Sequence, residues 1–104
     1  MAEKPEDLTV AYSEGGIETV QELDKVILSK GAWVTILFRY RDWERGKEAW
    51  GPEKYSIRRY QKRNGEFRQQ SKFNISSRAQ AQAIISALHR WQDADPASFA
   101  GEKP

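Results

Sequence analysis

The most strongly patterned part of this 104-residue chain is Lys54-Tyr-Ser-Ile-Arg-Arg-Tyr-Gln-Lys-Arg-Asn-Gly-Glu-Phe67, which continues as Arg68-Gln-Gln-Ser-Lys-Phe-Asn-Ile75. The Asn-Gly pair at its centre is a strong signal for a β-hairpin. A two-residue loop would mix the two Phe rings with the basic side chains of the first strand. A three-residue loop with a bulge pairs Lys62 with Glu66 and separates apolar from basic side chains. We therefore predict a bulged hairpin.

A second strand is predicted from Trp33 to Trp43, because β-branched and aromatic residues alternate there with a period of two. One face of this strand is apolar and carries Val34, Ile36, Phe38 and Tyr40. The opposite face carries Trp33, Thr35, Leu37, Arg39, Arg41 and Trp43. Residues 23–29 fit a strand or a helix, and we favour a strand; residues 44–52 have the glycines and proline of a long loop.

A helix is predicted to begin after Ser76 and Ser77, with Gln80 completing a capping box. Its apolar side chains recur at helical spacing and are Ala81, Ile84, Ile85, Leu88 and Trp91. We expect this stripe to cover one sheet face made by Val34, Ile36, Phe38, Tyr55 and Phe73. The predicted fold class is α+β, an antiparallel β-sheet of three or four strands followed by one C-terminal amphipathic helix. One such helix cannot cover four long strands, so we also expect a dimer.

The charges of the chain are unevenly distributed. Residues 30–91 contain fourteen Lys or Arg and five Asp or Glu, a net charge of +9, while the flanking residues carry a net charge of −7. We predict a flexible acidic arm over residues 1–16, a single sheet-plus-helix domain over 17–92, and a disordered tail over 93–104. A basic domain with this charge attracts polyanions.

The predicted hairpin register places cations and flat rings together on the open face of the sheet. The candidate nucleic-acid-binding residues are Trp33, Arg39, Arg41, Trp43, Lys54, Arg58, Tyr60, Lys62, Arg68 and Lys72. Lys and Arg neutralise phosphates, and aromatic rings stack on unpaired bases, which a duplex keeps hidden. This combination favours a single strand as the ligand, and Gln70 and Asn74 could reach base edges. The same cations could instead serve only to keep the strands soluble.

Other function classes find little support in the residues. There is no Cys and only one His, His89, so we expect no metal site, no cofactor and no enzymatic activity. The longest apolar run, Val34 to Phe38, is too short to span a bilayer, and the first sixteen residues lack the apolar core of a secretion signal. We expect a soluble cytoplasmic protein, in the nucleoid if its ligand is DNA.

The segment from Lys54 to Phe67, the following Gln70-Ser-Lys-Phe-Asn-Ile-Ser-Ser77 and the helix resemble the positive cofactor four-like single-stranded-DNA-binding transcriptional coactivators and their small bacterial relatives. The resemblance covers about residues 23–91. It implies a curved sheet, a homodimer formed largely through the helices, and sequence-tolerant binding of single strands or melted duplex. It assigns nucleic-acid contacts to Arg58, Tyr60 and Lys72. The chain departs from the family pattern in its longer loop at 44–52 and in Arg59, which should point toward the helix.

The sequence therefore predicts a non-enzymatic domain that binds single-stranded nucleic acid, DNA rather than RNA, as an accessory factor of transcription, replication or repair. The alternative is a protein-interaction module whose sheet face binds an acidic partner, such as part of the transcription machinery. The pattern leaves open the preference between DNA and RNA, the sequence selectivity, the biological process and the oligomeric state beyond a dimer.

Overall fold

The computed structural model describes residues 3–94 and confirms the α+β class. A 3-10 turn, Pro5–Asp7, precedes the strands, and the helix α1, Arg78–Ala94, follows them. The strands are β1 (Tyr12–Glu14), β2 (Ile17–Ser29), β3 (Trp33–Glu44), β4 (Ala49–Trp50), β5 (Lys54–Arg63) and β6 (Glu66–Ile75). The prediction of three or four strands was too low. The N-terminal segment adds β1, and the predicted loop at 44–52 contains β4.

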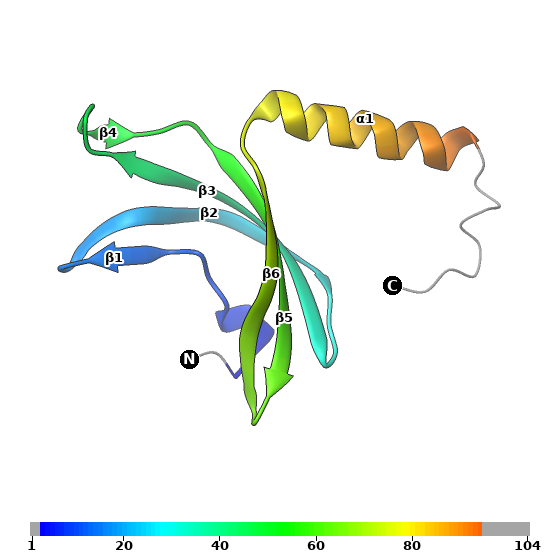
Figure 1. Cartoon of the computed structure of the whole chain (residues 1–104), viewed down its shortest axis with the longest axis horizontal. Coiled ribbons are helices and arrows are strands. Elements are labelled where there is room, and N and C mark those ends of the chain that lie inside the picture. The colour runs from blue at the N-terminus through cyan, green and yellow to red at the C-terminus, as the bar shows by residue number, and fades with distance from the viewer. Residues whose placement is uncertain (1–2, 95–104) are drawn as a thin grey trace.

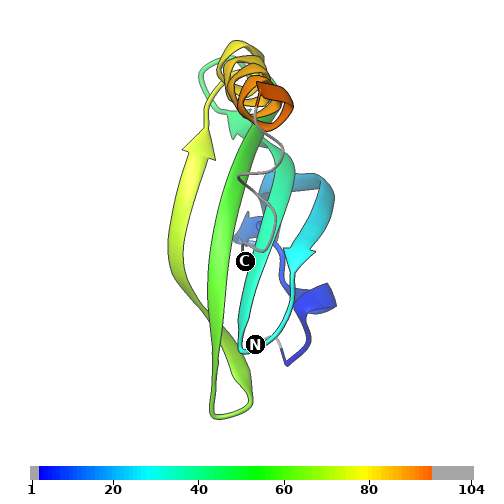
Figure 2. The same ribbon diagram turned by 90° about the vertical axis from the view of Figure 1, so that its right-hand side faces the viewer.

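The strands form one curled antiparallel sheet in the order β1-β2-β3-β5-β6, with β4 paired to β3 (Figure 1). Residues 23–29 belong to β2, so the favoured strand assignment is confirmed. Figure 2 shows β5 and β6 side by side as a long hairpin, with α1 at the end opposite its turn. The helix in the described part of the chain lacks the length and apolar character needed to cross a membrane.

The register between β3 and β5 defines the two faces of the sheet. Val34, Ile36 and Phe38 are fully buried and lie opposite Tyr60, Arg58 and Ser56, respectively. We call this side, which also carries Tyr40 and Lys54, the inner face, and the other side the outer face. The expectation that Tyr55 shares a face with Val34 was wrong. Alternation within each strand was predicted correctly, but it does not specify which faces of two strands coincide.

The inner face is covered along β2 and β3 by the N-terminal segment. Leu8 and Val10 are only 7% and 6% exposed and join the core of Val34, Ile36 and Phe38. Lys25 Nζ donates hydrogen bonds to the backbone carbonyls of Glu6 and Leu8, at 2.5 and 2.6 Å. Residues 5–14, assigned from the sequence to a flexible arm, thus contribute a 3-10 turn, a strand and two core side chains.

The β5–β6 hairpin differs from the predicted register. Arg63 pairs with Glu66 across a two-residue loop, and Asn64 and Gly65 have φ of 52° and 80°. The register shift lies further along, between Arg59 and Tyr60, where Gln70 is the extra residue of β6. The bulge therefore exists at a different position. The two-residue loop places Phe67 on the inner face, and the bulge then turns Phe73 to the outer face, opposite Ile57. A two-residue hairpin without the bulge would have left both rings on the face of Arg58.

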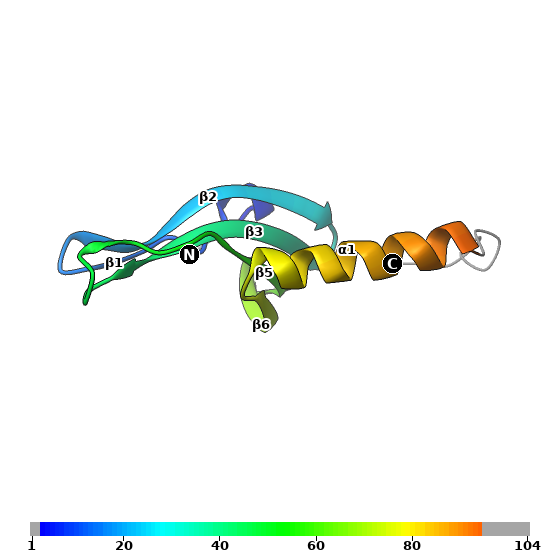
Figure 3. The same ribbon diagram turned by 90° about the horizontal axis from the view of Figure 1, so that it is seen from above.

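The helix begins as predicted, since the backbone N–H of Gln80 donates to Ser77 Oγ at 3.1 Å. It lies on the outer face, where its closest strand is β6, and extends beyond the sheet (Figure 3). The expectation that it covers Val34, Ile36 and Phe38 was wrong because these side chains point to the other face. The predicted tail at 93–104 overlaps the end of α1 at residues 93–94, and its residues 95–104 lie outside the described part.

Candidate nucleic-acid interface

The ten candidate residues are divided between the two faces of the sheet. Five lie on the inner face: Lys54, Arg58, Tyr60, Lys62 and Lys72. The other five lie on the outer face: Trp33, Arg39, Arg41, Trp43 and Arg68. The expected single basic and aromatic face is therefore not formed. The predicted pairing of β5 with β6 was shifted, and the relation of β5 to β3 could not be derived from the strand patterns alone.

The inner-facing side chains of β5 and β6 form a surface that we call the basic track. Its members are Lys54, Ser56, Arg58, Tyr60, Lys62, Phe67, Gln69, Lys72 and Asn74. Four of these side chains are cationic and none is acidic. The track runs beside the half of the inner face that the N-terminal segment covers. Ser56, Tyr60 and Phe67 are buried, so the track presents its positive charge at four separate cations along a two-stranded width of sheet.

Arg58 and Lys72 lie directly opposite each other at the centre of the track. In the described residues, neither side chain forms an ion pair with a carboxylate. Like charges facing each other across an antiparallel pair are destabilising, by about 0.2–1 kcal/mol relative to neutral pairs. An anion bound between Arg58 and Lys72 would remove this repulsion.

A network of neutral groups holds Arg58 in position. Its Nε donates to Ser56 Oγ at 3.3 Å, and its guanidinium also donates to Gln69 Oε1 at 3.2 Å. Ser56 is fully buried, and its hydroxyl donates to Asn74 Oδ1 at 2.8 Å. Because none of these partners is charged, the guanidinium is oriented without being neutralised.

The other two cations of the track have local partners. Lys54 Nζ lies 3.1 Å from a carboxylate oxygen of Asp42, and this hydrogen bond raises the pKa of the Lys54 ammonium. Lys62 Nζ lies 5.7 Å from the centre of the Phe67 ring, within the range of a cation–π interaction. Within the described residues, Lys54 is therefore the one cation of the track that is paired with a carboxylate, and Arg58, Lys62 and Lys72 keep their unneutralised charge.

Tyr60 belongs to the core rather than to the open surface. It is 5% exposed, and burial raises the pKa of its hydroxyl, an effect that nearby Arg58 partly opposes. Its ring therefore presents no open face on which a base could stack. In the hairpin register that the structure adopts, Tyr60 lies beside Gln69 rather than Arg68.

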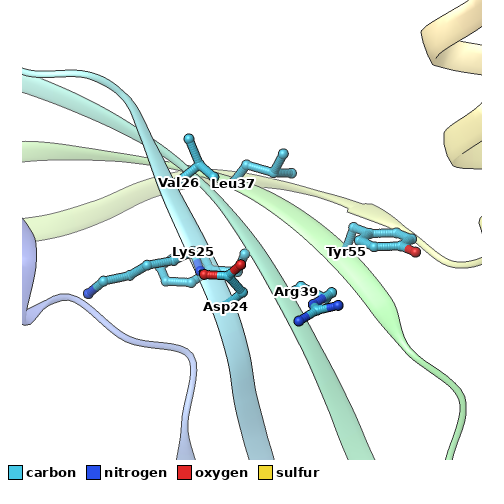
Figure 4. Close-up of a pocket in the computed structure, with 7 residues that line it drawn as sticks. Asp24, Lys25, Val26, Leu37, Arg39 and Tyr55 are labelled. Carbon is cyan, nitrogen blue, oxygen red and sulfur yellow. The ribbon is translucent and has the colours of Figure 1, made fainter.

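Arg39 and Arg41, the central cations of the outer face, each contact a neighbouring side chain. Arg39 lies 3.8 Å from Glu53 and opposite Asp24 in the β2–β3 register, and Figure 4 shows Lys25 directed away from this group. Arg41 Nε donates to Gln21 Oε1 at 2.6 Å, and the Arg41 guanidinium lies 4.9 Å from the centre of the Trp50 ring.

Trp43 and Trp50 pack against each other at the far end of the outer face. Their rings meet edge to face, with centroids 5.4 Å apart, and the two residues are paired in the β3–β4 ladder. The loop that contains Trp50 thus folds back onto the sheet. Arg68, at the other end of this face, lies 3.8 Å from Glu66.

An apolar band crosses the middle of the outer face. Its four members are aligned by the register across β2, β3, β5 and β6 and are Val26, Leu37, Ile57 and Phe73. A pocket of about 390 Å³ separates this band from the helix. The helix residues Ile85, Leu88 and Trp91 are more than half exposed. We call the band and these helix residues together the apolar outer surface.

Sequence reasoning missed Gln69 and Ser56 as partners of Arg58. The Asn-Gly turn was the signal that could have found Gln69, because a two-residue loop by itself brings Gln69 opposite Tyr60 and next to Arg58. Asn74 was proposed as a base-reading residue, and the structure places it on the track, hydrogen-bonded to Ser56.

The chain matches no family model, no curated protein and no solved structure in the comparisons.

Proposed function

We propose that this protein binds single-stranded nucleic acid along the basic track. The observation that carries the proposal is the Arg58–Lys72 pair, two cations placed opposite each other and oriented by neutral partners only. A phosphate between them would satisfy both side chains. Lys62 extends the unneutralised positive charge toward the β5–β6 turn, so a second phosphate of the same strand can be neutralised, whereas Lys54 at the other end of the track is paired with Asp42.

The shape of the track supports a single strand as its ligand. Adjacent β-strands are spaced by about 5 Å, so a surface two strands wide follows one phosphate backbone rather than two. The amides of Gln69 and Asn74 lie beside the Arg58–Lys72 pair and can donate to the edges of unpaired bases. In a duplex, most of these edges are already paired.

We further propose that two copies associate through the apolar outer surface. About half of the surface of Val26 and Phe73 on the sheet, and of Ile85, Leu88 and Trp91 on the helix, is exposed, and the band and the helix line a common pocket. Soluble monomers rarely leave so many large apolar side chains open in one region. A two-fold arrangement would bury this surface against itself, and the basic tracks of both copies would remain accessible on the opposite faces. This assembly is consistent with the homodimer implied by the family resemblance. The same resemblance implies a role as an accessory factor of transcription, replication or repair in the cytoplasm or nucleoid.

The proposal is tested by fluorescence anisotropy with labelled oligothymidine and with a duplex of equal length. We expect the wild-type protein to prefer the single strand and the Arg58→Ala/Lys72→Ala variant to bind it at least tenfold more weakly. The matched control is Arg63→Ala/Lys47→Ala, which removes the same charges outside the track. Equal losses of affinity in both variants would show that binding depends on the net charge of the protein and not on the basic track.

The same experiment separates nucleic acid from the second candidate ligand, an acidic protein segment, whose carboxylates could also pair with Arg58 and Lys72. Absence of binding to either oligonucleotide at low salt would contradict the nucleic-acid proposal. An acidic protein segment would then become the leading candidate for the ligand of the Arg58–Lys72 pair.

A further inference from the structure

A second concave site lies on the outer face, at the turn between β2 and β3. It is a pocket of about 600 Å³. Its walls include Leu28, Trp33 and Arg59, none of which takes part in the basic track. The pocket lies at the same end of the sheet as Lys62, whose backbone N–H donates to the carbonyl of Ala32 at 2.8 Å.

Arg59 and Trp33 form a flat platform in this pocket. The guanidinium carbon of Arg59 lies 4.6 Å from the centre of the Trp33 ring, and Trp33 is 39% exposed. Within residues 3–94, Arg59 makes neither an ion pair nor a side-chain hydrogen bond. A guanidinium that is stacked on one side keeps its N–H donors free in the plane and can stack a second ring on its other side.

Hydroxyl groups lie next to this platform. Ser29, Thr35 and Arg59 are aligned across β2, β3 and β5 by the register, and all three line the pocket. The β2 register shift between Ile27 and Ser29 leaves Leu28 as the extra residue, and Leu28 contributes an exposed apolar wall. Lys30 also lines the pocket, but its ammonium lies 2.7 Å from Glu6, so its charge is already matched.

We propose that this pocket binds one unpaired nucleotide of a strand that leaves the basic track at Lys62 and passes round this end of the sheet to the outer face. The base stacks on the free side of the Arg59 guanidinium, which Trp33 supports, and the in-plane N–H groups of Arg59 donate to the adjacent phosphate. Ser29 and Thr35 offer hydroxyls to the edge of the base. This inference rests on the proposed function, and it supplies the stacking that the buried Tyr60 ring does not provide.

The test uses fluorescein-labelled oligothymidine with Trp33→Leu and Arg59→Lys. Arg59→Lys keeps the charge but removes the flat stacking surface, so we expect about fivefold or greater loss of affinity in each variant. The double variant should lose little more than either single variant, because the two side chains act as one platform. The matched control is Arg63→Lys, which should bind like the wild-type protein.

An abasic strand of equal length provides the second readout. The wild-type protein and the Arg59→Lys variant should bind the abasic strand equally, because no base is left to stack. Arg59→Lys affects an exposed side chain without hydrogen bonds, so it keeps the test valid if Trp33→Leu fails to fold.

The outcomes distinguish this pocket from the basic track. Loss of binding only in Arg58→Ala/Lys72→Ala, with Trp33→Leu and Arg59→Lys unchanged, would overturn the pocket and leave the track in place. Loss only in Trp33→Leu and Arg59→Lys, restricted to strands with bases, would support the pocket and overturn the track. Absence of binding by the wild-type protein would overturn both proposals.

Discussion

Ser56 is the residue on which the geometry of the proposed site depends most. It is fully buried between the core and the track, and its hydroxyl joins Arg58 to Asn74. A buried hydroxyl with a partner on either side stabilises the fold and at the same time restricts the rotamers of Arg58. The fold and the site are therefore coupled at this position.

We predict that Ser56→Ala lowers the free energy of unfolding by about 1–3 kcal/mol, because Asn74 and Arg58 lose a buried partner. Affinity for oligothymidine should fall less than in a variant that lacks Arg58 itself. Urea denaturation and anisotropy on the same preparation measure both effects. Ser71→Ala, at an exposed position opposite Arg59, is the control. Equal stability of the two variants would contradict the assigned network.

The buried hydroxyl of Tyr60 predicts a specific dependence of stability on pH. Burial raises its pKa above the ordinary value of about 10, so the unfolded chain loses this proton at a lower pH than the folded protein. The contribution of Tyr60 to stability is complete below pH of about 10 and decreases as the pH rises through the folded-state pKa.

Tyr60→Phe should therefore flatten the decrease in unfolding free energy above pH of about 10. Urea denaturation of the wild-type protein and the variant at several values between neutral and strongly alkaline pH provides the measurement. Tyr12→Phe is the control, because Tyr12 is exposed. Indistinguishable pH profiles for Tyr60→Phe and the wild-type protein would contradict the effect of burial.

Among the elements of the fold, the N-terminal segment is the one whose packing on the sheet could not be predicted from its composition. Its acids and glycines are typical of a flexible arm, yet Leu8 and Val10 close the core over β2 and β3. Two apolar residues spaced by two give too short a pattern to be distinguished from chance in a polar stretch. Because the helix packs on the outer face, the inner face needs another cover, and Leu8 and Val10 provide it.

We predict that Leu8→Ala destabilises the protein by about 2–5 kcal/mol, as expected for a buried leucine. Ile17→Ala is the matched control, because Ile17 is exposed and should change stability little. Thermal and urea denaturation of the two variants provide the comparison. A negligible effect of Leu8→Ala would show that the segment does not pack on the sheet in solution.

The elements themselves could largely be predicted from the sequence, whereas their relative placement could not. The alternation from Val34 to Tyr40 and the spacing from Ala81 to Trp91 identified a half-buried strand and an amphipathic helix. The alternation within each strand was predicted correctly, but the register of β3 against β5 depends on tertiary packing. The candidate residues of the two strands were therefore assigned to one face although they lie on opposite faces. Arg59 was expected on the helix side, and the structure confirms this.

At the scale of the whole molecule, the two faces of the sheet have different chemistry. The inner face combines a closed core with the basic track, and the outer face combines an apolar band with a helix that extends past the sheet (Figure 3). One copy leaves the apolar outer surface exposed, which a single small domain tolerates poorly in water. Self-association through this surface would leave both basic tracks open.

We predict that Leu88→Glu converts the proposed dimer into a monomer, because a charge placed in the proposed interface would be buried without a partner. Sedimentation equilibrium measures the mass directly. Ile17→Glu also places a charge on an exposed apolar residue, but outside the apolar outer surface, and should leave the mass unchanged. A monomeric wild-type protein at high concentration would contradict the proposed association.

The most direct test of the basic track is the salt dependence of oligothymidine binding by the wild-type protein and by Arg58→Ala/Lys72→Ala. Each neutralised phosphate contributes about 0.7 to the slope of log K against log salt for a single strand, so losing the one phosphate that Arg58 and Lys72 share should make the slope shallower by about 0.7. Arg63→Ala/Lys47→Ala should keep the wild-type slope. If the slopes of the wild-type protein and Arg58→Ala/Lys72→Ala are the same, the Arg58–Lys72 pair does not bind phosphate and the basic track is not the binding site.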